Sequence, residues 1–73
     1  MPQFEFDAVG RDAVSGLHRG RDAADAVRRA TADDALSVSD AAGDGGWLAV
    51  TGADGAPAGR VRDHAARMRF RRD

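Results

Sequence analysis

Residues Trp47 to Arg62 read WLAVTGADGAPAGRVR, two strand-forming runs on either side of a short segment rich in glycine. The dipeptide Asp54-Gly55 between such runs is typical of a two-residue hairpin turn. A turn at these two residues also fixes the register, because it brings Leu48 opposite Val61 on one face of the hairpin. This part of the chain therefore predicts an antiparallel hairpin with an apolar face.

The other face of this hairpin is polar and contains the only tryptophan. The same register brings Trp47 opposite Arg62, and Ala49 opposite Arg60. Pro57 has no amide hydrogen to donate, so a strand that contains it is expected at a sheet edge.

The N-terminal segment predicts a second hairpin. From Gln3 to Val9 the chain alternates, with Phe4 and Phe6 on one face and acidic residues on the other, as in a half-buried strand. The segment from Gly10 to Gly16 has the composition of a turn. Residues Leu17 to Arg21 are then expected to return as a polar second strand.

A helix is predicted between the two hairpins. Asp22 is a favourable N-cap, and Asp25 three residues later resembles a capping box. The helical run that follows is rich in alanine and arginine. Its apolar face consists of Ala23, Val27, Ala30 and Thr31. We expect the helix to end near Asp34 or Ala35, and Leu36 to Val38 to leave it as an extended segment that includes a possible short strand.

These elements predict one small α+β domain with the order ββαββ, an antiparallel sheet and one helix packed on it. The predicted domain covers residues 1–63, and residues 64–73 form a basic C-terminal tail, for which helical, extended and flexible states all remain open. The expected core consists of Phe4, Phe6, Val27, Leu48, Val50 and Val61.

The charges are distributed unevenly along a chain whose formal net charge is only -1. Up to Gly59 the acidic residues outnumber the arginines, whereas the last fourteen residues contain six of the eleven basic side chains. Asymmetry of this kind bears on binding partners rather than on fold. All the basic residues are arginine, which codon bias in a GC-rich genome explains.

The arginine-rich end suggests a surface for nucleic acid or for a protein partner, because clustered cations bind phosphates and an aromatic ring can stack on a base. The candidate contact residues are Trp47, Arg60, Arg62, Arg67, Arg69, Arg71 and Arg72. Two other interpretations remain open. The arginines can be solvated or paired with the protein's own acids, and Trp47 can pack against Arg62 or in a dimer.

No catalytic, cofactor-binding or metal-ligating residues are predicted. The two histidines, His18 and His64, are expected at the surface, and the serines lack the context of a nucleophile. The loop from Asp40 to Gly46 lacks the spacing of a calcium site. With no cysteine, disulfides and thiolate metal sites are excluded.

We therefore expect a non-catalytic interaction or accessory module, acting through a sheet edge or its charged C-terminal end, with nucleic-acid binding as the alternative function. The large apolar side chains are few for 73 residues, so self-association, as a homodimer, is expected. The predicted sheet edges are Pro57–Arg62 and the second strand, since an uncovered edge can pair with another copy. The sequence contains no signal pattern or apolar run of about 20 residues, so a cytoplasmic location is expected and no membrane or small-molecule partner is inferred.

Overall fold

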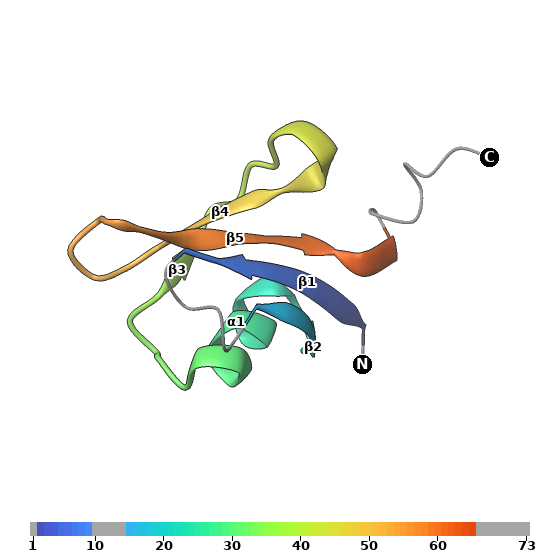
Figure 1. The fold of residues 1–73 in the computed structure, drawn as a ribbon, viewed down its shortest axis with the longest axis horizontal. Coiled ribbons are helices and arrows are strands. Elements are labelled where there is room, and N and C mark those ends of the chain that lie inside the picture. The colour runs from blue at the N-terminus through green and yellow to red at the C-terminus, as the bar shows by residue number, and fades with distance from the viewer. Residues whose placement is uncertain (1, 10–14, 66–73) are drawn as a thin grey trace.

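The computed structural model describes residues 2–9 and 15–65, which form a five-stranded antiparallel sheet with one helix against one face (Figure 1). In chain order the elements are β1 (Gln3–Ala8), β2 (Gly16–Arg19), α1 (Ala23–Thr31), β3 (Ser37–Val38), β4 (Leu48–Thr51) and β5 (Pro57–Asp63), with a short 3₁₀ turn at Asp44–Gly46. The α+β class is confirmed. The extended segment after the helix contains a strand, β3, so the described order is ββαβββ.

The strands follow the order β2-β1-β5-β4-β3, which places β5 at the centre of the sheet. The predicted edge at Pro57–Arg62 is therefore wrong, whereas the predicted edge at the second strand is confirmed. The pairing of β5 with β1 ends at Gly59, which lies opposite Ala8. Pro57 lies beyond that point, at the first position of its strand, where a missing N–H costs no bond to β1.

The β4–β5 turn differs from the expected two-residue turn. The N–H of Gly52 donates to the carbonyl of Ala56 at 2.9 Å, so the loop spans three residues, Ala53 to Gly55. Gly55 has a φ of +82°, the left-handed conformation that such a loop requires at its last position.

The expected register is nevertheless found further along the hairpin, where Leu48 lies opposite Val61. The ladder is irregular between Val50, which lies opposite Gly59, and Thr51, which lies opposite Pro57. Ala58 is thus an extra residue on β5, a bulge that offsets the one-residue shift of the longer loop.

The core lies between the sheet and α1. Its buried members are Phe4, Phe6, Ala8, Ala26, Val27, Val50, Ala58 and Val61, and Leu48 packs against them partly buried. All six predicted core residues are thus found there. The list of expected core residues did not include the buried alanines Ala8, Ala26 and Ala58.

The helix begins as predicted and ends earlier than predicted. The side chain of Asp22 accepts the N–H of Asp25 at 2.8 Å, as an N-cap does. At the other end Ala32 is left-handed, with a φ of 56°. The Thr31 hydroxyl accepts the N–H of Asp33, whose carboxylate accepts the N–H of Ala35. These local hydrogen bonds form a turn that competes with another helical turn.

Strand β5 ends at Asp63, the last residue of the predicted domain, and the carboxylate of Asp63 accepts the N–H of Ala65 at 2.7 Å. Most of the predicted tail, residues 66–73, lies outside the described residues.

Candidate interaction surface

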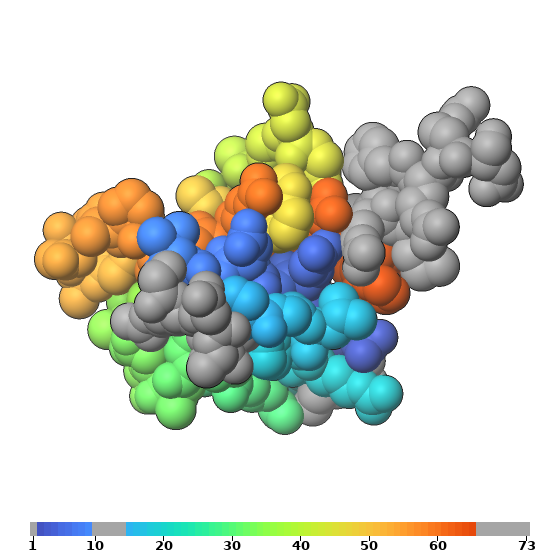
Figure 2. Space-filling model, in the orientation of Figure 1, coloured from blue at the N-terminus to red at the C-terminus, as the bar shows by residue number. Residues whose placement is uncertain are grey.

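The sheet has one face against α1 and one face turned away from it, which we call the outer face. Since side chains alternate along a strand, the burial of Phe4 and Phe6 on the helix side places Glu5 and Asp7 of β1 on the outer face. In Figure 2 the blue atoms of β1 and the orange atoms of β5 meet yellow atoms of the segment leading into β4.

Trp47 and its two neighbouring arginines form the centre of the outer face. The guanidinium carbon of Arg60 lies 4.2 Å from the centroid of the Trp47 ring, and that of Arg62 lies 4.1 Å from it. Both distances are well within the range of a cation–π interaction. The expected packing of Trp47 against Arg62 is therefore found, and Arg60 joins it.

Each of these arginines also contacts an acid directly opposite on β1. Arg62 donates from Nε to Glu5 Oε1 at 3.1 Å and from Nη1 to the carbonyl of Gly45 at 3.3 Å. Arg60 donates from Nε to Asp7 Oδ2 at 3.0 Å. The Arg62 side chain is only 17% exposed, whereas those of Arg60 and Asp7 are 53% exposed. The outer face is thus charge-balanced at its centre.

The structure brings together the first three of the predicted contact residues: Trp47, Arg60 and Arg62. The other four, Arg67, Arg69, Arg71 and Arg72, lie outside the described residues. Since Arg60 and Arg62 already contact carboxylates and the tryptophan ring, a phosphate would have to compete with both contacts.

Strand β2 offers a second surface, the edge of the sheet. The N–H of Gly20 donates to the carbonyl of Pro2 at 3.2 Å, and His18 lies opposite Phe4 in the same ladder. Backbone groups alternate in an antiparallel pair, so those of Leu17 and Arg19 point away from β1. No described residue hydrogen-bonds to these outward groups. The side chain of Leu17 is 45% exposed. Among the described residues, Leu17 and Val9 are the two large apolar residues that are exposed.

A third surface is a cluster of three arginines around Asp25 on α1. Asp25 Oδ2 lies 3.1 Å from Arg29 Nε and 3.8 Å from Arg21 Nε, and its Oδ1 lies 3.7 Å from Arg28 Nη2. A hydrogen bond from the Arg21 backbone N–H lowers the pKa of Asp25, and the Arg29 and Arg21 guanidinium groups act in the same direction, against the effect of desolvation. The cluster was not predicted from the sequence. The positions of Arg28 and Arg29, three and four residues after Asp25, are the signal that indicates it.

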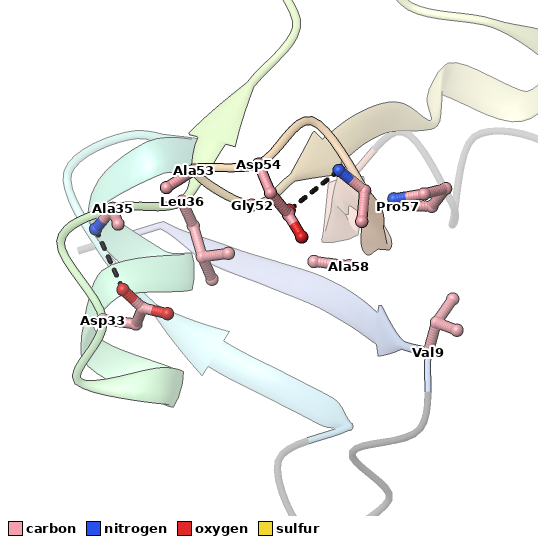
Figure 3. A pocket seen from close by; sticks show the side chains of 10 residues that line it. Val9, Asp33, Ala35, Leu36, Gly52, Ala53, Asp54, Pro57 and Ala58 are labelled. Carbon is pink, nitrogen blue, oxygen red and sulfur yellow. Dashed lines mark hydrogen bonds between the residues drawn. The ribbon is translucent and has the colours of Figure 1, made fainter.

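An open pocket of about 470 Å³ lies between the turn after α1 and the β4–β5 loop (Figure 3). Its lining is mostly small and apolar: Val9, Ala35, Leu36, Gly52, Ala53, Ala56, Pro57 and Ala58, together with Asp33 and Asp54. One oxygen of each carboxylate accepts a backbone N–H of its own turn, from Ala35 and Ala56 respectively. The pocket therefore contains two acidic groups that both take part in turn structure.

Within residues 2–9 and 15–65, no three His, Asp or Glu side chains are grouped as a metal ion would require. None of the helices in this part of the chain is long and apolar enough to cross a membrane.

Comparison with models of known protein families, with curated proteins and with solved structures gives no significant match.

Proposed function

We propose that this protein is a small non-catalytic interaction module that associates with a second copy of itself through the edge of β2. The observation that supports the proposal most is the set of outward backbone groups at Leu17 and Arg19. Such a row of donors and acceptors is a template for another strand. A cytoplasmic location belongs to the same proposal.

A second copy fits this edge because the edge is self-complementary. With a two-fold axis at His18, Leu17 lies opposite Arg19 of the other copy, and each such pair exchanges both of its backbone hydrogen bonds. The aliphatic stem of that arginine covers the exposed leucine while its guanidinium stays in water. The five-stranded sheets of the two copies then form one continuous sheet.

The side chain of Leu17 supports the same edge. Its neighbours on the outer face are charged, since Glu5 lies directly opposite it on β1. Leu17 is 45% exposed, so covering it with another strand stabilises the association by about 25 cal/mol per Å² of apolar surface removed from water.

The test compares two exposed aliphatic residues. We expect Leu17→Lys to shift the protein from dimer to monomer, because an edge lysine disfavours strand addition. Val9→Lys is the matched control, since Val9 is 62% exposed but follows β1 rather than lying on the β2 edge. The measurement is light scattering during size exclusion over a range of protein concentrations. A wild-type protein that stays monomeric at high concentration, or equal effects of the two substitutions, contradicts the proposal.

A further inference from the structure

The cluster around Asp25 carries a net positive charge. Three guanidinium groups, those of Arg21, Arg28 and Arg29, lie within 4 Å of one carboxylate. One cation neutralises Asp25. Even when the exposed neighbour Asp22 is counted, the arginines exceed the acids of the cluster.

These arginines also have donors to spare. A guanidinium group has five N–H donors, and the carboxylate is approached by one nitrogen of each arginine in the contacts above. The side chains of Arg21, Arg28 and Arg29 are 77%, 43% and 52% exposed, so their remaining N–H groups are accessible to a ligand. A planar fork of N–H groups matches the oxygens of a phosphate, which it can bind in a bidentate manner.

Asp25 is the carboxylate around which the three arginines gather. Its side chain is only 10% exposed, and it accepts both the backbone N–H of Arg21 at 2.9 Å and the Nε–H of Arg29 at 3.1 Å. A carboxylate fixed in this way orients the Arg29 side chain, which then loses less conformational entropy on binding a ligand. The guanidinium groups of Arg21 and Arg28 lie 3.8 and 3.7 Å from the same carboxylate. Arg29 is therefore oriented before any ligand arrives, and all three guanidinium groups lie around one buried carboxylate.

We propose that Arg21, Arg28 and Arg29 form a phosphate-binding site on the surface of α1. The ligand class is a phosphate group, either free or in the backbone of a single-stranded nucleic acid. This site is separate from the outer face with Trp47, Arg60 and Arg62, and it does not depend on pairing through β2.

The test uses the full chain and two probes, inorganic phosphate and a fluorescently labelled single-stranded oligonucleotide, each at low and at moderate salt. The double substitution Arg28→Gln/Arg29→Gln should weaken binding about tenfold or more, because it removes two charge-assisted contacts. Glutamine keeps a high helix propensity, so α1 should be retained, which circular dichroism checks.

The matched control is Ala42→Glu/Ala53→Glu, which lowers the net charge by the same amount at two exposed loop positions outside the cluster. We expect it to change binding by no more than about two- to threefold, as the loss of nonspecific attraction does. If the wild-type protein binds both phosphate and the oligonucleotide, the site recognises the phosphate group itself. If it binds the oligonucleotide alone, the site recognises the nucleic-acid backbone. Either result supports the proposal when the cluster variant loses the binding and the control variant keeps it. Equal losses in both variants, or no wild-type binding to either probe at low salt, would overturn it.

Discussion

Gly20, which directly follows β2, lies very close to the backbone of α1. A Cβ atom added there would overlap the backbone nitrogen of Ala26, and Gly20 itself is buried. Ala26 belongs to α1 and is only 1% exposed, so neither backbone can move aside easily. Gly20→Ala should therefore destabilise the fold by about 1–3 kcal/mol, the usual cost of overpacking a core. Chemical denaturation measures this, and an unchanged midpoint would contradict the close approach.

The charge of Asp25 should make stability depend on pH. Because the pKa of Asp25 is lowered in the folded state, its contribution is present above the ordinary aspartate pKa, near 4, and is lost as the pH falls through the lower folded-state value. Asp25→Asn should thus lower the free energy of unfolding at pH 7. The difference from wild type should shrink in acid, below the folded-state pKa. Denaturation at the two pH values tests this, and a difference independent of pH would show that the charge is not involved.

At the scale of elements, the pairing of β1 with β5 is reinforced by the two cross-strand ion pairs. Arg62→Ala should cost about 1–3 kcal/mol, since Arg62 is largely buried and hydrogen-bonds Glu5 and Gly45. Arg60→Ala should cost less than about 1 kcal/mol, because its ion pair is half exposed to water. The two arginines lie on the same face of β5, two residues apart, and each faces an acid of β1, so each variant is a control for the other. Equal losses of unfolding free energy in urea denaturation would contradict the deeper burial of Arg62 compared with Arg60.

The sequence predicted most elements because each is specified by nearby residues. The alternation from Phe4 to Ala8, the N-cap at Asp22 and the apolar pairs of the β4–β5 hairpin are local signals. The position of β5 was mispredicted because strand order depends on pairing between residues more than fifty positions apart. The end of α1 was mispredicted because side-chain hydrogen bonds of Thr31 and Asp33 outweigh alanine's helix propensity.

At the scale of the whole molecule, the candidate surfaces were only partly predictable. The register of the hairpin placed Trp47 and Arg62 together, and the structure confirms that contact. The acids that pair with Arg60 and Arg62 could not be assigned, because they come from β1 and the β1–β5 pairing was not foreseen. The β2 edge was foreseen as one of two candidates.

The central claim, that the protein associates through the outward backbone groups of β2, is tested most directly by amide hydrogen exchange measured by NMR at low and high protein concentration. The amide of His18 points toward β1 by strand alternation and serves as an internal reference. We predict that the Leu17 and Arg19 amides exchange more slowly at high concentration, while exchange at His18 changes much less. Exchange at Leu17 and Arg19 that stays fast and independent of concentration would contradict association through this edge.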